Sequence, residues 1–344
     1  MEEMQLPRIL FFIFLLVAPQ AWADTLKVAY HRDLNTPSGR ALSVFANEVE
    51  ACTKGEITIK LFPGGQLANP NEAVTGVAQG TIEMALVPAS SMQLVNPVFG
   101  VLSVPLVFNN RQHWEAALSG DAAKALSDLA ASRGLKSLGF AGGAQFGILS
   151  INPIQSLADL EGKSIRSPGQ SGNVLASLGA APRSIAFAEV LSALQTGVVD
   201  SAELTPAAAR QIKADEVAKS YARTNHRILT ELFVINADRF AGLNEEAQKC
   251  VTSEAAKAME IARKTVVEEE IAVLAAFADQ GMNVTRLKDR SEMFERGSVA
   301  RDGIVGELKA GPLFNLIAAS ASCPDSCTAD DCDSSTCQMC KFCE

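Results

Sequence analysis

The side chain whose chemistry best suits small-molecule binding is Arg166, which lies near the end of a strand-like stretch, 163–167, before a loop and a short helix. A planar guanidinium offers two parallel N–H donors to a carboxylate, and such charge-assisted pairs are stronger than neutral hydrogen bonds. A surface arginine paired with Asp159 or Glu161 is an equally good interpretation of the position alone. The elements around Arg166 must therefore decide between an anion site and a surface ion pair.

Strands and helices alternate in the same order in two parts of the chain. Residues 26–30 and 57–61 alternate as strands do, and 82–87 form the nearly continuous apolar run of a buried parallel strand. Helices separate these strands, one opened by Thr36-Pro37 and one running from Asn69-Pro70 to Gly80. The order returns later as strand-like 163–167, helix 172–178, strand-like 183–187, helix 188–196 and strand 198–203. Two similar α/β lobes are predicted, with a ligand in the cleft beyond the carboxyl ends of the strands.

One long helix is expected over 245–280. Asn244 is a good N-cap, and apolar residues recur at three- and four-residue steps: Val251, Ala255, Met259, Ala262, Val266, Ile271, Leu274 and Ala278. At 1.5 Å per residue the helix would be about 54 Å long, which exceeds one lobe. A coiled coil is the alternative, but the stripe has no sustained heptad. The pattern favours a helix that spans both lobes.

The first 23 residues have the layout of a secretory signal peptide. Arg8 precedes a short apolar run, 9–18, and Ala21-Trp22-Ala23 forms a small-x-small cleavage pattern before Asp24. A membrane anchor is the alternative, but a spanning helix needs about 20 apolar residues, roughly twice this run. Cleavage would leave a mature chain that is secreted to the periplasm and not embedded in a membrane.

The net charge of the chain limits the kinds of partner that it is expected to bind. The formal net charge is −9, and Glu2, Glu3 and Arg8 of the leader carry −1, so the mature chain carries −8. Nucleic acid selects basic faces, so it is not an expected partner. An anionic ligand would need a local cationic site on this acidic protein.

The cysteines fall into two groups. Cys52 and Cys250 lie in the body of the chain, and whether they pair depends on a distance that the sequence does not give. Six more crowd the tail, 323–344: Cys323, Cys327, Cys332, Cys337, Cys340 and Cys343. A small disulfide knot and a soft-metal site are possible interpretations. A disordered appendage rich in Ser, Asp and Thr is favoured over both, and no metal site or cofactor is expected.

Several stretches together resemble the solute-binding proteins of tripartite ATP-independent periplasmic (TRAP) transporters, of the C4-dicarboxylate-receptor type. They are Leu61-Phe62-Pro63-Gly64-Gly65-Gln66-Leu67, the segment 97–105, the segment 159–168 that ends in Ile165-Arg166-Ser167-Pro168, Phe187-Ala188-Glu189-Val190, residues 194–200, and Thr224-Asn225-His226. The resemblance covers the chain from about Leu26 to the region of Phe294. It implies a two-lobed α/β solute-binding fold with a central cleft, which traps a small organic carboxylate and delivers it to the membrane subunits.

The resemblance also implies site residues. Arg166 matches the arginine that pairs with the ligand carboxylate, and Phe187 matches an aromatic residue that lines the cleft, although it could equally belong to the core. Ser90 and Ser91 match a pocket loop and could donate to an anion. Glu203 could accept from a ligand hydroxyl or pair across the hinge. His226 matches a histidine near the crossing between lobes, where a structural role is the more common one.

Departures from the family pattern limit the kinds of acid that the site is expected to bind. Phe146 stands where some relatives carry a second arginine, Gly169 stands at an often polar position, and Leu204 stands where a pocket asparagine is expected. A second ligand carboxylate would need another cation, for which Arg32 is the nearest candidate. These departures disfavour sialic acid and favour a mono- or dicarboxylate with some apolar character.

The expected division is a signal peptide at 1–23, lobe I at 24–143 with part of 232–260, lobe II at 144–231 with part of 261–322, and the tail at 323–344. A hinge is expected near 139–143 and 232–236. No catalytic, phosphate-binding or dinucleotide motif is found, so an enzyme is not expected. Two alternatives stay open: a ligand-binding protein that reports to a sensor kinase, and metal handling by the cysteine-rich tail.

Overall fold

The computed structural model describes residues 24–321. The expected signal peptide, 1–23, and the cysteine-rich tail, 323–344, lie outside the described residues. Within the described range, no helix combines the length and the apolar character that a membrane crossing requires.

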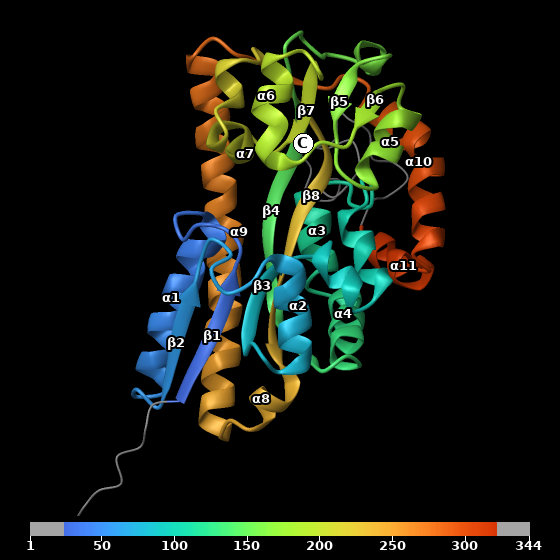
Figure 1. Ribbon diagram of the computed structural model, residues 1–344. Helices are drawn as coiled ribbons and strands as arrows, with labels where there is room; N and C mark the ends of the chain where they lie inside the picture. The colour runs from blue at the N-terminus through green and yellow to red at the C-terminus, as the bar shows by residue number, and fades with distance from the viewer. Residues whose placement is uncertain (1–23, 322–344) are drawn as a thin grey trace, which may run out of the picture.

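The described residues form one mixed sheet with helices around it (Figure 1). Its order is β2-β1-β3-β8-β4-β7-β5-β6, with β9 beside β8. The bounds are β1 (Asp24–Tyr30), β2 (Ile57–Phe62), β3 (Met84–Pro88), β4 (Leu135–Ser150), β5 (Ser164–Arg166), β6 (Ala181–Arg183), β7 (Ser201–Leu204), β8 (Ser220–Asn236) and β9 (Asn283–Arg286).

Two halves of the molecule share this sheet. In Figure 1 the lower half holds β1, β2 and β3 with α1 (Pro37–Cys52) and α2 (Pro70–Gln79). The upper half holds β5, β6 and β7 with α5 (Ser171–Ser177), α6 (Val190–Gln195) and α7 (Pro206–Gln211). The long antiparallel strands β4 and β8 run through both halves. This arrangement is the expected two-lobed α/β fold.

Helix α9 (Glu245–Asp279) runs along both halves, as its sequence pattern predicts (Figure 1). Its first part buries Val251, Ala255 and Met259 in an apolar cluster with residues of α1, β1 and β3. Its last part contributes Val273 and Phe277 to a separate cluster with residues of α6, β7 and α7. The expected stripe is wrong at Ile271, which is 64% exposed, and at Ala278, which is also exposed, because the buried face of the last turns passes through positions 270, 273 and 277.

The remaining helices are α3 (Arg111–Ala117), α4 (Asp121–Ala131), α8 (Ala237–Ala241), α10 (Arg290–Glu307) and α11 (Gly311–Ala319). Helix α10 contacts α5 of the upper half, whereas α11 contacts α3 and α4. The chain thus returns towards residues that the expected division assigned to the first lobe. The residue boundaries of the two lobes stay a prediction.

Local signals in the sequence place most elements correctly. Thr36 caps α1 by accepting from the Gly39 amide, and Asn69 and Glu72 form a reciprocal capping box at the start of α2. Gly80 ends α2 with a φ of +76°, a conformation that glycine adopts without strain. The strand expected over 183–187 is wrong: β6 ends at Arg183, and Phe187 begins a 3₁₀ turn, η4 (Phe187–Glu189).

Cys52 and Cys250 form a disulfide whose Cα atoms lie 6.0 Å apart. It joins the last residue of α1 to the first turns of α9, 198 residues later in the chain. The bond therefore fixes the lower part of α9 to the lower half.

The crossing strand β4 has an irregular segment in the middle. Its register against β8 shifts between Ser137 and Gly139 and again between Gly142 and Gln145. Side chains of α3 and α9 bond to the backbone there. Arg111 donates to the Gly143 carbonyl at 3.0 Å and to Glu270 at 3.1 Å, and Glu270 accepts from the Gln145 amide at 3.0 Å.

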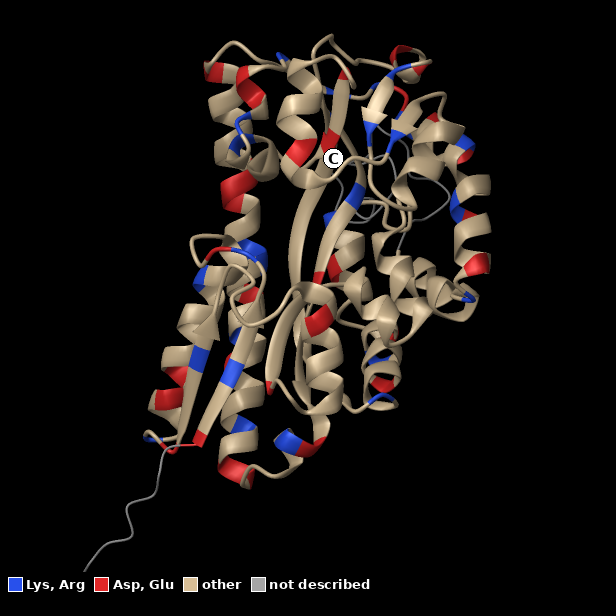
Figure 2. Ribbon diagram, viewed as in Figure 1, with Lys and Arg blue, Asp and Glu red and all other residues tan. Residues whose placement is uncertain are grey.

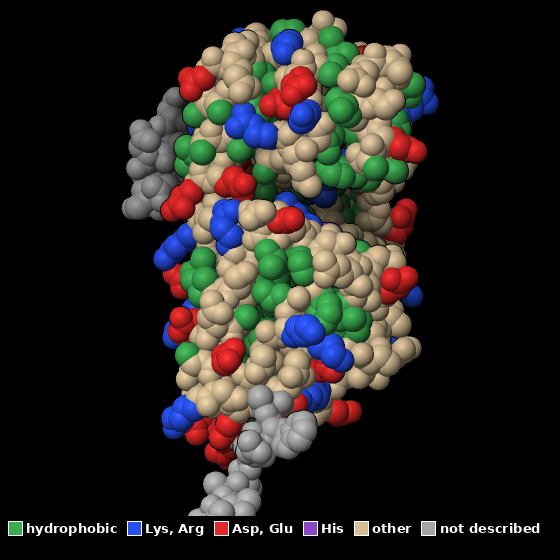
Figure 3. Space-filling view, turned by 60° about the vertical axis from the view of Figure 1, so that its left-hand side comes forward, with side chains coloured by type: hydrophobic (Ala, Val, Ile, Leu, Met, Phe, Trp, Pro, Cys, Tyr) green, Lys and Arg blue, Asp and Glu red, His purple; other side chains and the backbone are tan. Residues whose placement is uncertain are grey.

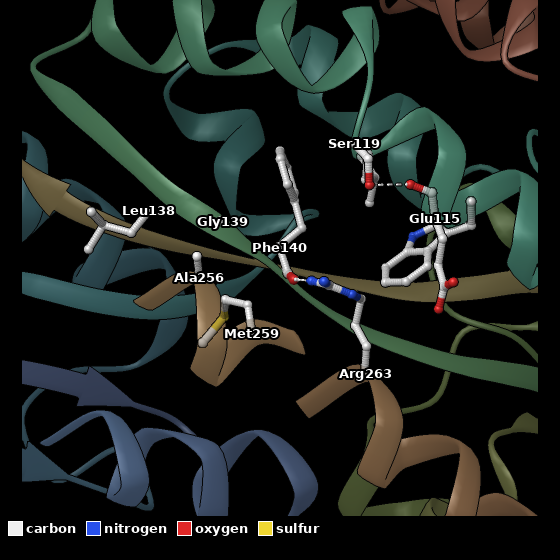
Figure 4. Close-up of a pocket in the computed structure, with 10 residues that line it drawn as sticks. Glu115, Ser119, Leu138, Gly139, Phe140, Ala256, Met259 and Arg263 are labelled. Atoms are coloured by element: carbon white, nitrogen blue, oxygen red, sulfur yellow. Dashed lines mark hydrogen bonds between the residues drawn. The ribbon is translucent and has the colours of Figure 1, made fainter. Parts of the chain in front are cut away.

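A hollow of about 150 Å³ lies beside this segment, where α3, β4 and α9 meet (Figure 4). Arg263 reaches across it and donates from Nη1 to the Phe140 carbonyl at 2.7 Å. The irregular segment of β4 is thus bonded by side chains of neighbouring helices, and it coincides with the expected hinge at 139–143. Whether the halves move about this segment stays a prediction.

Candidate functional site

The shorter strands of the two halves end facing one another. Pro88, the last residue of β3, stands opposite Glu231 of β8, while Leu204, the last residue of β7, stands opposite Gly147 of β4. Since β3 is antiparallel to β8 and β7 is antiparallel to β4, both carboxyl ends point towards the middle of the crossing strands. The surface is hollowed between the halves (Figure 3). Ligands of open α/β sheets bind at such edges.

The upper edge is organised around a buried carboxylate, Glu203 of β7, which is fully shielded from solvent. The Ser167 hydroxyl donates to it at 2.6 Å and the Ser171 hydroxyl at 2.8 Å. Arg227 of β8 donates to its Oε1 at 2.7 Å, and His226 Nε2 lies 3.2 Å from the same atom. A buried charge persists only when it is paired and hydrogen-bonded, and Glu203 satisfies both conditions.

These hydrogen-bond and charge partners control the protonation of Glu203. Burial by itself would raise the pKa of Glu203, but the Arg227 guanidinium, then His226 and the Ser167 hydroxyl, hold the pKa well below its ordinary value. Glu203 is therefore ionised at neutral pH, and its partners come from the upper half and from the crossing strand β8.

Arg227 also stacks on an aromatic ring. Its guanidinium carbon lies 3.6 Å from the centroid of Phe146, its register partner on β4. A guanidinium over a ring face is attracted by the ring quadrupole, and the planar groups hold each other in place. Phe146 therefore packs against a cation of the upper edge, and its contact with a ligand stays a prediction.

Arg166 ends β5 beside Glu203 and is 6% exposed. Its Nε donates to the Ile185 carbonyl at 3.0 Å, while Nη1 lies 3.5 Å from the Glu203 carbonyl, at the limit of a hydrogen bond. Burial lowers the pKa of Arg166, with Glu203 opposing the shift and Arg227 adding to it. The alternative partner Asp159 bonds instead to the backbone amides of Gln155 and Ser156. Because Nε is anchored, the fork formed by the two Nη atoms keeps a fixed direction.

His226 is 1% exposed, and both of its ring nitrogens face protein atoms. Nδ1 lies 2.6 Å from the Thr224 hydroxyl and Nε2 lies 3.2 Å from Glu203. This geometry matches the structural role that the sequence left open for His226, and its contact with a ligand stays a prediction.

The other predicted site residues lie around the two edges. Ser90 is exposed in the turn after β3, and Ser91 is buried at the start of η1 (Ser91–Leu94). Phe187 is 40% exposed, so it is not a core residue. Arg32 is half-buried in the connection between β1 and α1.

Sequence reasoning missed Arg227, the cation closest to Glu203. It directly follows Thr224-Asn225-His226, so an extension of that motif by one residue would have included it. Nothing local indicates its partners, because Glu203 and Phe146 lie 24 and 81 residues away along the chain. Among residues 24–321 no cluster of three or more potential metal ligands occurs.

The fold and the facing polar edges define a two-lobed solute receptor. Residues 28–300 match the family described as bacterial extracellular solute-binding protein, family 7. The chain belongs to this family, which comprises solute-binding proteins of TRAP transporters, and the resemblance seen in the sequence is confirmed.

Relatives and solved structures agree with this assignment. The chain is 30% identical to the 2,3-diketo-L-gulonate-binding periplasmic protein of Escherichia coli K12, over 84% of this chain and 89% of that protein. It is 29% identical to the C4-dicarboxylate-binding periplasmic protein of Rhodobacter capsulatus, over 72% and 75%. A TRAP periplasmic solute-binding protein of Roseobacter denitrificans, solved with bound β-D-glucuronate, superposes with a TM-score of 0.77 at 28% identity, over 86% of this chain and 99% of that one.

Proposed function

We propose that this protein is the periplasmic receptor of a TRAP transporter, that Arg166 binds the carboxylate of a small organic acid in the cleft, and that the closed receptor delivers the acid unchanged to the membrane subunits. Residues 1–23 would direct export and be removed. The names of the relatives support an acid ligand, since they include binders of 2,3-diketo-L-gulonate and C4-dicarboxylates.

The observation that carries the proposal is the hydrogen bonding of the Arg166 guanidinium. Nε is fixed by the Ile185 carbonyl, and within residues 24–321 Nη2 makes no hydrogen bond. A buried guanidinium whose Nη atoms are not fully hydrogen-bonded can donate to the two oxygens of a carboxylate. Arg166 and Arg227 together carry two positive charges against the single negative charge of Glu203, so the upper edge is cationic on balance. Elsewhere acidic and basic residues are interspersed over both halves (Figure 2).

Calorimetric titration of the exported protein with a panel of organic acids tests the proposal. D-Glucuronate, 2,3-diketo-L-gulonate, succinate and malate are suitable members of the panel. At least one acid should bind, and Arg166→Ala should weaken its binding by about 2–5 kcal/mol, because one partner of a buried charge pair is lost.

Arg296→Ala is the matched control, since Arg296 is exposed on α10 and, among the described residues, forms an ion pair only with Glu292. It should leave the affinity unchanged. Recovery of the bound acid in unaltered form separates a receptor from an enzyme. A protein that binds none of the acids, or an Arg166→Ala variant with wild-type affinity, contradicts the proposal.

A further inference from the structure

A second polar cluster lies at the lower edge, where β1 and β3 end. Glu231 of β8 stands opposite Pro88 and is 1% exposed. The Ser38 hydroxyl, in the first turn of α1, donates to Glu231 Oε2 at 2.5 Å. Within residues 24–321 Glu231 has no ion pair and no other side-chain hydrogen bond. A buried carboxylate with one hydroxyl donor keeps unused acceptor capacity, because its two oxygens offer about four lone-pair sites.

His31 lies directly after β1 in the same corner. Its Nδ1 atom is buried and makes no hydrogen bond within the described part of the chain. Burial lowers the pKa of His31, while Glu231 opposes the shift and Arg32 adds to it, so the ring is neutral at pH 7. A neutral imidazole nitrogen can accept from or donate to a hydroxyl group, depending on the tautomer. A buried polar atom without a partner is uncommon in a native protein, and a ligand group would satisfy it.

Glu231 and Arg32 bring opposite charges to this corner, but Glu231 is 1% exposed whereas Arg32 is half-buried, so water screens the charge of Arg32 more. Burial is the largest cause of the raised pKa of Tyr30, and the effect of Glu231 on that pKa exceeds the opposing effect of Arg32. The same order holds at His31. A second ligand carboxylate placed beside the buried Glu231 would face a like charge. The role of Arg32 as a cation for such a carboxylate stays a prediction.

The two edges lie close together along the crossing strand β8. Arg227 and Glu231 are four residues apart on β8, so their Cα atoms lie roughly 13 Å apart at about 3.3 Å per residue. The upper edge holds two arginines beside Glu203, and the lower edge holds the buried carboxylate of Glu231. A ligand that suits both ends carries its carboxylate at one end and hydroxyl groups at the other.

We infer that Glu231 and His31 form a hydroxyl-binding subsite that selects polyhydroxylated monocarboxylates, of the sugar-acid class, over dicarboxylates. The inference rests on the proposed function, since Arg166 must hold the single carboxylate. Glu231 accepts hydrogen bonds from ligand hydroxyls, and these bonds are strengthened by its charge. The same charge repels a carboxylate at that end of the ligand.

The test compares D-glucuronate with D-glucarate, which has the same number of carbons and a second carboxylate. In calorimetric titrations of the exported protein, D-glucuronate should bind at least about tenfold more tightly than D-glucarate. Glu231→Gln should weaken D-glucuronate binding by about 10- to 100-fold, because a neutral amide with one acceptor oxygen replaces a charged carboxylate with two. The same substitution should reduce the preference for D-glucuronate over D-glucarate.

Glu254→Gln is the matched control, because Glu254 is a buried carboxylate on α9 that pairs with Lys257 at 2.8 Å. It should leave both affinities unchanged, and thermal unfolding of each variant checks its folding. Equal binding of the two acids by the wild-type protein overturns the inference, whether or not Glu231→Gln folds.

Other outcomes separate the inference from the proposed function. If Arg166→Ala abolishes binding of D-glucuronate while a folded Glu231→Gln keeps the wild-type affinity, the subsite is wrong and the receptor stands. Tight binding of succinate with no binding of D-glucuronate likewise overturns the subsite and leaves the receptor in place. A wild-type protein that binds no acid at all overturns both.

Discussion

Arg227 directs both Nε and Nη2 at a single carboxylate oxygen of Glu203, each at 2.7 Å, although the two residues come from different strands, β8 and β7. The contact joins a crossing strand to the sheet of the upper half. Among residues 24–321 it also leaves Arg166, the neighbouring cation, without a carboxylate partner, because the Nη atoms of Arg166 reach only the Glu203 backbone carbonyl there. The Glu203–Arg227 pair thus holds the upper edge together, and the proposed function assigns Arg166 to the ligand.

Loss of this pair should destabilise the protein. Glu203→Ala leaves the Arg227 guanidinium buried without its counterion, so the free energy of unfolding should fall by about 3–5 kcal/mol. Chemical denaturation measures it. Glu292→Ala on α10, which removes an exposed i,i+4 partner of Arg296, should change the free energy by less than about 0.5 kcal/mol. Equal losses of unfolding free energy in the two variants would show that the buried pair stabilises the protein no more than the exposed pair does.

Stability should depend on pH through Glu203. Its pKa is lower in the folded protein than in the unfolded chain, so its contribution is present above the unfolded value of about 4.3 and is lost as the pH falls below it. Melting temperatures between pH 3 and pH 7 should therefore decline more steeply for the wild type than for Glu203→Gln. Parallel profiles would rule out this contribution.

The disulfide should stabilise the protein without acting on the ligand. Replacing Cys52 and Cys250 together by serine should lower the free energy of unfolding by about 2–5 kcal/mol, because the closed loop restricts the unfolded chain. Affinity for the acid should stay the same, since the bond lies at the end of α1 remote from the strand edges. A changed affinity in the folded double variant would contradict this separation.

The irregular segment of β4 should not tolerate a side chain at Gly142. Its φ is +104°, and a Cβ there would lie 2.2 Å from the Leu229 carbonyl oxygen. Gly142→Ala should therefore destabilise the protein by more than the roughly 1–3 kcal/mol of an unfavourable φ alone. Gly162→Ala is the control, because Gly162 also has a positive φ, +67°, but has open space around its Cβ position. Thermal unfolding of the two variants separates steric overlap from backbone strain.

Much of the fold could be predicted because its signals are local. The cap at Thr36, the capping box at Asn69 and the periodic apolar residues after Asn244 each act within a few residues, and each element lies where its signal placed it. The prediction was less accurate for the strands of the upper half. Strand β6 ends at Arg183, where a short edge strand gives way to a loop and leaves Phe187 in a 3₁₀ turn.

The sequence by itself determined the receptor family, the two-lobed α/β fold, the long helix and the candidate role of Arg166, since motif order and hydrophobic periodicity are properties of neighbouring residues. The tertiary structure alone decided the pairing of Cys52 with Cys250, the stacking of Arg227 on Phe146, and the hydrogen bond from Ser38 to Glu231. These partners lie 198, 81 and 193 residues apart along the chain. Contacts of that range depend on strand order and register, which many distant residues set together.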